Sequence, residues 1–218
     1  MSKVLVHDYR IHVKGVKRKI IYQFSDVHLN LADELSSDVE RQEVTKNIEN
    51  WHRGRRAFAE AFNEPCGEEQ SAEAYEHFEN LLKKAQEDGD ALIMAGDIFD
   101  YINDAHVRFF EKKFSNFTIP YVFACGNHEH ADKIPDGSRL ALIKQPVQVL
   151  NLGDLIIMAF DNSKRIITME QINALKSQLE LKKPIIIAMH IPIQSENNKV
   201  LKSREEYYRL NPPGCPKE

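Results

Sequence analysis

The sequence has little cysteine, no long apolar run and no excess of positive charge. Its cysteines, Cys66, Cys125 and Cys215, are widely spaced and form no CxxC pair, which argues against a disulfide framework and a structural zinc site. No apolar stretch reaches the roughly 18 residues that a membrane span needs, and the first residues lack the apolar core of a secretory signal. We therefore expect a cytoplasmic protein with no membrane partner.

The charge balance is slightly acidic, with 29 Lys and Arg against 33 Asp and Glu and a net charge of -4. No global positive charge attracts nucleic acid, so a nucleic-acid partner is not expected. A polyanionic substrate must then be held locally, by metal ions or by a few placed cations. The length of 218 residues, of which 42% are apolar, predicts a single globular domain over residues 1–218.

Apolar patterning predicts an order of strands and helices. Residues 4–24 alternate and break at Lys14-Gly15, which predicts two antiparallel strands joined by a turn. Residues 34–88 shift to charged residues at helical spacing, interrupted at "NEPCGEE", which predicts an insertion of two or three helices. Strands are predicted for the later segments "ALIMAG", "PYVFACG", "LIIMAF" and "KPIIIAMH". Helices are predicted for "DAHVRFFEKKF" and "TMEQINALKSQLE", and the second of these has Thr168 and Gln171 at capping-box spacing. An α/β or α+β layered sandwich follows, with helices on both faces of the sheet.

Polar residues that can bind metals follow four of these apolar segments. The ligand site of such sheets lies beyond the carboxyl ends of the strands, so these positions should meet. They are Asp26 and His28, Asp97 and Asp100, Asn127 and His128, and His190.

Carboxylate, carboxamide and imidazole groups suit Zn²⁺, Fe and Mn²⁺. Converging Asp26 and Asp97 would repel unless cations lay between them. Taken singly, each has a simpler interpretation: a helix N-cap for Asp26 or Asp97, a hydrogen-bonded core histidine for His190, and a turn residue for Asn127. The joint pattern favours a centre of two metal ions that hydrolyses a phosphoester.

The segments "SDVH", "AGDIFD", "GNHE" and "MHIP" resemble the ordered motifs of the calcineurin-like metallophosphoesterases. The likeness runs from about Lys19 to Ile193, interrupted between Asp33 and Asp88. It implies a four-layer α/β/β/α sandwich and a hydrolase with two divalent metal ions, Mn, Fe or Zn. Its substrate would be a phosphomonoester or phosphodiester, attacked by a metal-bridging hydroxide.

The resemblance also implies a role for each residue. Asp26 and His28 would bind the first metal, Asp97 would bridge both, and Asn127 and His190 would bind the second. His128 would donate a proton to the leaving group without ligating a metal, and Asp100 would orient His128. Glu129 is expected to fix the loop by hydrogen bonding.

One family motif is missing. No G-H-x-H follows His190, and the remaining segment supplies no closing strand, so the sandwich is expected to lack its C-terminal strands. Either the chain stops short or the site is degenerate, each metal then keeping three protein ligands. The sequence spacing gives no support for His52, His106 or His130 as replacements for the ligands of the missing motif.

Two rival functions remain open: a noncatalytic interaction module that keeps the fold, and a nuclease, against which the acidic charge argues. The helix face that carries Arg53, Arg55 and Arg56 is expected to face solvent. The alternative is that this helix forms a cap whose arginines bind an anionic group. Lys164 and Arg165 are loop residues that could contact substrate. His106 is expected at the surface of its helix, and Cys125 is expected to be a small buried residue.

Overall fold

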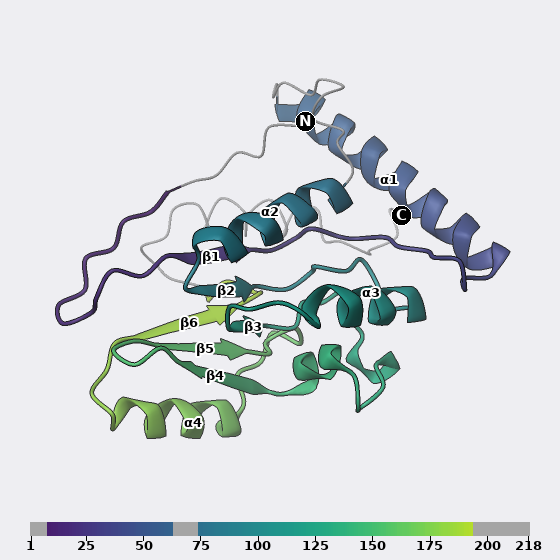
Figure 1. Cartoon of the computed structure of the whole chain (residues 1–218). Coiled ribbons are helices and arrows are strands. Elements are labelled where there is room, and N and C mark those ends of the chain that lie inside the picture. Colours follow the sequence, from purple (N-terminus) through teal and green to yellow (C-terminus); the bar gives the residue numbers. More distant parts are fainter. Residues whose placement is uncertain (1–7, 63–73, 194–218) are drawn as a thin grey trace, which may run out of the picture.

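The computed structural model describes residues 8–62 and 74–193, which form two small sheets flanked by helices (Figure 1). The first sheet is parallel and has the order β1 (Ile21–Phe24), β2 (Ala91–Met94), β3 (Tyr121–Phe123). The second has the order β4 (Val147–Asn151), β5 (Ile156–Phe160), β6 (Ile185–Met189), with β4 antiparallel and β6 parallel to β5. The helices are α1 (Asp38–Phe62), α2 (Ala74–Asp88), α3 (Asp104–Phe114) and α4 (Met169–Leu179), with short 3₁₀ turns at Ala131–Lys133 and Arg139–Lys144.

Alternation along the central strands creates the layers. In β2, Leu92 and Met94 face a core shared with α2 and α3, whereas Ile93 faces the second sheet. In β5, Ile157 faces the first sheet and Met158 faces α4. The sequence of layers is therefore α2 and α3, first sheet, second sheet, α4, which confirms the predicted α/β/β/α sandwich (Figure 1).

The contact between the sheets is built largely from small side chains. Five of its buried members are alanines, and the others are Ile93, Val122 and Ile157. Because both faces of β2 and β5 are covered, these strands read as continuous apolar runs rather than as alternating ones. This explains why "ALIM" and "IIMAF" were recognisable as strands from sequence.

The predicted N-terminal hairpin is wrong for the residues that the structure describes. A turn is present at Lys14–Gly15, with Gly15 at a φ of 85°, but residues 8–20 form no strand and β1 begins only at Ile21. The backbone N–H of Lys17 donates to Asp154 Oδ2 at 2.8 Å instead of to a neighbouring strand. The segment is largely exposed, so its alternation does not reflect one buried face.

Strand β4 was not predicted from the sequence, because its "VQVLN" places a glutamine within an otherwise apolar run. Gln148 is nevertheless buried, and its carboxamide bonds to both backbone groups of Phe123, accepting from N–H at 2.9 Å and donating to C=O at 2.6 Å. A polar side chain thus links β4 to the edge of the first sheet. Within the described residues of the predicted insertion lie the two helices α1 and α2.

His106 is buried, contrary to the surface position predicted for it. Its side chain is 0% exposed in the first turn of α3. Nδ1 accepts from the backbone N–H of Asn103, the residue that caps the helix in return, and Nε2 lies 3.1 Å from Leu29 O. Amphipathic spacing alone does not reveal a histidine that caps its own helix. Burial lowers the pKa of His106 to about 4.

Within residues 8–62 and 74–193, no helix is long and apolar enough to cross a membrane. The predicted break at "NEPCGEE", the cysteines Cys66 and Cys215 and the segment after Ile193 lie outside the described residues. Cys125 is buried, as predicted. The capping box of Thr168 and Gln171 is present at the start of α4.

Candidate metal centre

The predicted site residues converge where β1, β2, β3 and β6 end. Asp97, in the turn after β2, is at the middle of the group and is 3% exposed. Asp26, His28 and Asp97 all adopt left-handed backbone conformations, with φ of 55°, 51° and 52°. Such conformations cost about 1 kcal/mol or more for residues other than glycine and concentrate at functional sites. Three polar residues here are held in strained turns beside one another.

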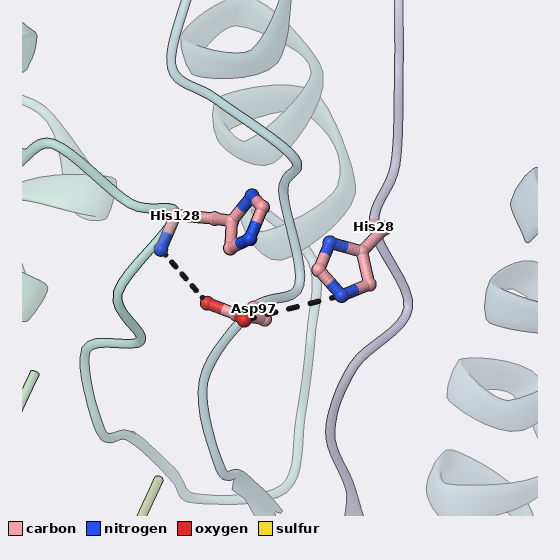
Figure 2. A group of neighbouring side chains, drawn as sticks. All are labelled: His28, Asp97 and His128. Atoms are coloured by element: carbon pink, nitrogen blue, oxygen red, sulfur yellow. Dashed lines mark hydrogen bonds and ion pairs between the residues drawn. The ribbon is translucent and has the colours of Figure 1, made fainter. Parts of the chain in front are cut away.

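The carboxylate of Asp97 presents its two oxygens differently. Oδ1 accepts from the backbone N–H of His128 at 3.0 Å. Oδ2 lies 3.2 Å from Nε2 of His190 and 3.9 Å from Nε2 of His28. Figure 2 shows the Asp97 carboxylate between His28 and the backbone of His128. One oxygen is thus used by the loop after β3, and the other faces two imidazoles.

Each of these imidazoles is held with Nε2 toward Asp97. His28 Nδ1 lies 3.3 Å from Asp100 Oδ1, and His190 Nδ1 lies 3.0 Å from the carbonyl oxygen of Ala95. Both partners are acceptors, so in the neutral form of each ring Nδ1 carries the hydrogen and the Nε2 lone pair is directed at the centre. A carboxylate or backbone carbonyl in this position fixes the tautomer of metal-binding histidines.

Asn127 lies on the His190 side of the centre. Its Oδ1 is 3.1 Å from His190 Nε2. The Nε2 atom therefore faces two oxygens, one from Asp97 and one from Asn127. This is the juxtaposition predicted for the second metal.

Potential ligand atoms within 4.8 Å of one another form two groups that share Asp97. One group is His28, Asp97 and His128, and the other is Asp26, Asp97 and His190. Asp97, the residue predicted to bridge two metals, is the residue that these two groups share. The partition differs from the prediction, because in the described part of the chain Asp26 falls with His190 rather than with His28, and His128 lies close enough to join the His28 group.

Two glycines make room for this arrangement. A Cβ on Gly126 would lie 2.1 Å from Asp97 Oδ1 and 2.3 Å from Asp97 N, far inside contact distance. A Cβ on Gly96, whose φ is 85°, would lie 2.6 Å from the ring of His190. The glycines in "AGD" and "CGN" are thus required by close approach to the ligand residues.

Glu129 anchors the same loops, as predicted. It is 3% exposed and accepts hydrogen bonds from the backbone N–H groups of Asp97, Ile98, Phe99 and Gly126. Burial raises the pKa of this carboxyl to about 7, against the opposing effect of these donors. One side chain therefore ties the turn after β2 to the turn after β3.

Asp100 lies between two histidines. Its Oδ1 is 3.1 Å from Nδ1 of His128 and 3.3 Å from Nδ1 of His28. Burial alone would raise the pKa of Asp100, but hydrogen bonds from His128, His28, Trp51 and Asn30 lower it well below its ordinary value. The hydrogen bond to Asp100 raises the pKa of His128 to about 9. The predicted contact to His128 is present, and the contact to His28 is an addition that the sequence did not suggest.

Asp97 and His190 also shift each other's pKa. Burial would raise the pKa of Asp97, but hydrogen bonds from His190 and from the His128 backbone lower it. Burial would lower the pKa of His190, but the hydrogen bond to Asp97 raises it. The two residues behave as an ion pair beside the acidic Asp26.

The helical insertion reaches the centre through Trp51, a contact that the sequence did not predict. Its ring lies 4.2 Å from the His28 ring, between centroids, at an interplanar angle of 31°. Val44, Ile48 and Trp51 follow one another at spacings of four and three residues on α1, which is the signal of a helix face that packs inward. The pattern shows a buried face but not which surface it covers.

Among the predicted arginines of α1, the two with described side chains are exposed. Arg53 is exposed and donates to Asn50 Oδ1 at 2.8 Å, and Arg56 is exposed too, so both fit the solvated face that was predicted; the Arg55 side chain lies outside the described residues. Lys164 and Arg165 are exposed in the loop after β5. Of the possible substitutes for the missing motif, His52, His106 and His130 join neither ligand group in the described ranges.

The donor set fits divalent metal ions. It offers carboxylate oxygen and imidazole nitrogen within 4.8 Å in each group, and the carboxamide oxygen of Asn127 lies 3.1 Å from His190 Nε2. The nearby Cys125 instead directs its sulfur at the Glu129 carbonyl, 3.3 Å away. Oxygen and imidazole ligands without thiolate suit Mn²⁺, Fe and Zn²⁺.

The fold and this donor set agree with the class of metal-dependent phosphoesterases. The family model for the calcineurin-like phosphoesterases matches residues 20–214, and the chain belongs to that family. A search of curated proteins found no match to this chain.

Proposed function

We propose that this protein hydrolyses a phosphomonoester or phosphodiester at a centre of two divalent metal ions. The observation that carries the proposal is the position of Asp97. Its Oδ2 lies 3.2 Å from Nε2 of His190 and 3.9 Å from Nε2 of His28, and these two histidines belong to different ligand groups. Asp26, His28, Asp97, Asn127 and His190 would hold the metals. Mn, Fe and Zn all suit this set.

When bound, the cations would neutralise charge on the phosphoryl oxygens and lower the pKa of a water molecule. The chain's own residues would do the rest. Asp97 keeps one oxygen toward the centre because the other is held by the His128 amide. His28 and His190 are oriented through Asp100 and the Ala95 carbonyl.

His128 is proposed as the proton donor to the leaving group. Its Nδ1 is held by the Asp100 carbonyl at 3.0 Å and carboxylate at 3.1 Å, which leaves Nε2 as the donor. With a pKa of about 9 it is protonated at neutral pH. Its membership of the His28 ligand group is a competing role, and metal content of the His128→Ala variant separates the two.

The test is release of a phenol from a generic aryl phosphate with and without added Mn²⁺. We expect metal-stimulated turnover in the parent protein and none in Asp97→Asn, which removes the charge of the shared ligand. Asp132→Asn, at an exposed position, is the matched control and should retain activity. Elemental analysis of all three proteins links the loss of turnover to loss of metal.

A noncatalytic interaction module is the alternative, motivated by the few ligand residues that each group contains within residues 8–62 and 74–193. It predicts no metal-stimulated release from any aryl phosphate. Bound metal without turnover would favour this alternative, and turnover without dependence on Asp97 would contradict the metal centre itself.

A further inference from the structure

Trp51 brings the helical insertion into contact with the candidate metal centre. Its ring centroid, on α1, is 4.2 Å from that of His28 and 6.4 Å from that of His128. The Trp51 side chain also forms a hydrogen bond with Asp100. Indole nitrogen can only donate, so the Asp100 carboxylate is the acceptor. One side chain of α1 thus contacts a proposed metal ligand and also the carboxylate that orients the proposed proton donor.

Asp100 serves two histidines whose proposed tasks differ. Its Oδ1 lies 3.1 Å from Nδ1 of His128 and 3.3 Å from Nδ1 of His28. The two imidazole rings are nearly perpendicular, at 83°, with their centroids 4.7 Å apart. A displacement of Asp100 would therefore disturb a metal ligand and the proton donor at once.

Four side chains donate hydrogen bonds to this carboxylate, and they are His28, His128, Asn30 and Trp51. An ionised carboxylate has about four acceptor sites, so these donors satisfy it. His28 and Asn30 belong to the loop after β1, and His128 belongs to the loop after β3. Trp51 comes from the insertion, which makes α1 a third segment that fixes the position of Asp100.

The helix α1 is also held by contacts that do not involve Trp51. Val44, on the same helix, is 7% exposed. Before the helix, the carboxylate of Asp33 accepts two hydrogen bonds from the guanidinium of Arg108 on α3, at 2.7 and 2.8 Å. Replacing Trp51 should therefore remove its contacts to the centre without releasing the helix.

We propose that Trp51 is a positioning residue of the phosphoesterase, and that the helical insertion acts on catalysis through it. The indole N–H holds Asp100 where this carboxylate orients both His28 and His128, and the indole face restricts the His28 ring. The insertion then contributes to hydrolysis of any phosphoester, not only to selection among phosphoesters. This inference rests on the proposed function, because it acts through the proposed metal ligand and the proposed proton donor.

The hydrogen bond can be observed without activity. Trp51 is the single tryptophan of the chain, so it gives one indole signal in a nitrogen–proton correlation spectrum. In the metal-free protein we expect Asp100→Ala to move this signal upfield, because the indole proton loses a charged acceptor. Asn50→Ala, which removes the hydrogen bond from Arg53 on the exposed side of the same helix, should leave the signal in place. An unmoved signal in Asp100→Ala would overturn the proposal.

The affinity for Mn²⁺ measures the effect on His28. Trp51→Phe keeps an aromatic face for His28 but has no N–H for Asp100, and we expect it to weaken Mn²⁺ binding in calorimetric titration by roughly threefold to tenfold. Asn50→Ala should bind Mn²⁺ like the parent protein, and thermal unfolding checks that each variant is folded.

A double-mutant cycle tests whether Trp51 acts through Asp100. In the Asp100→Ala background, adding Trp51→Phe should change the affinity for Mn²⁺ by less than about twofold, because the acceptor is already absent. Equal weakening in both backgrounds would show that Trp51 only supports the helix, and it would overturn the proposal.

Turnover measures the effect on His128 and separates this inference from the proposed function. At saturating Mn²⁺, Trp51→Phe should lower kcat for an aryl phosphate with a poor leaving group by roughly tenfold, with KM within about twofold of the parent value. For an acidic leaving group, kcat should fall by less than about threefold.

Hydrolysis of both substrates at rates that Trp51→Phe leaves unchanged would overturn this inference alone. Hydrolysis of neither substrate by the parent protein would overturn the proposed function, and the Mn²⁺ titrations would then decide whether Trp51 positions His28.

Discussion

The side chain of Asp100 lies 3.1 Å from Nδ1 of His128, and the backbone carbonyl of Asp100 lies 3.0 Å from the same atom. This double contact fixes the ring and raises the pKa of His128 to about 9. His128→Ala should therefore slow hydrolysis of substrates with poor leaving groups by roughly 10²–10⁴-fold. Substrates with acidic leaving groups, which need no proton, should be affected much less.

Metal content decides between the two roles of His128. Retention of bound metal by His128→Ala is the expected result, measured by elemental analysis beside kcat for aryl phosphates of graded leaving-group basicity. Loss of metal from this variant would instead make His128 a ligand of the His28 group.

Metal affinity should rise with pH through the range in which His190 titrates. Its pKa lies above the ordinary value because of Asp97, and a protonated imidazole cannot bind a metal. Below that pKa, apparent affinity should fall by up to about tenfold per pH unit for each proton released. Calorimetric titration with Mn²⁺ in buffers of different ionisation enthalpy measures the released protons. A pH-independent affinity with no proton release would contradict ligation by His190.

The motifs identified from the sequence lie together because the ends of these strands meet in space, although the strands are far apart along the chain. Asp26, Asp97, Asn127 and His190 each follow an apolar segment, and the carboxyl ends of those strands meet at one edge. Local pattern was sufficient to find them. It was not sufficient to predict which ligand atoms lie in one group, such as those of Asp26 and His190, because that depends on side-chain directions in strained turns such as the one at Asp26.

Two features depended on packing between distant segments. The contact of Trp51 with His28 joins an inserted helix to the loop after β1, and helical spacing does not say what the apolar face covers. The burial of His106 arises from hydrogen bonds to Asn103 and Leu29. These satisfy a polar group that composition alone places at the surface.

His106 should make the protein less stable as the pH falls. Its pKa is about 4 in the folded protein and about 6.5 in an unfolded chain. Between those values the unfolded state binds more protons, so the free energy of unfolding falls with falling pH. From pH 7 to pH 5 this one group should remove about 2 kcal/mol.

Denaturant unfolding at both pH values measures this contribution. His106→Gln should be less stable than the parent protein at pH 7 but should lose less stability on acidification. His12→Gln, at an exposed position, should leave the pH dependence unchanged. An identical pH dependence in His106→Gln and the parent protein would show that His106 is not buried in its neutral form.

Gly126 should be the most sensitive glycine of the centre to a single added methyl group. In Gly126→Ala the new Cβ would lie 2.1 Å from Asp97 Oδ1, so either the carboxylate or the loop after β3 must move. Moving the carboxylate breaks its hydrogen bond to the His128 amide and displaces the shared ligand of both groups. We expect loss of bound metal and at least a hundredfold loss of turnover, about 2.7 kcal/mol in activation free energy.

Gly137→Ala is the matched control, because a Cβ at Gly137 meets no atom within 4 Å. It should bind metal and turn over substrate like the parent protein. Thermal unfolding of both variants tests whether Gly126→Ala still folds, and a folded Gly126→Ala protein with normal metal content would show that Asp97 does not need its present position to hold the metals. A folded variant with less metal would show that the close approach of the two loops, rather than the ligand residues alone, builds the centre.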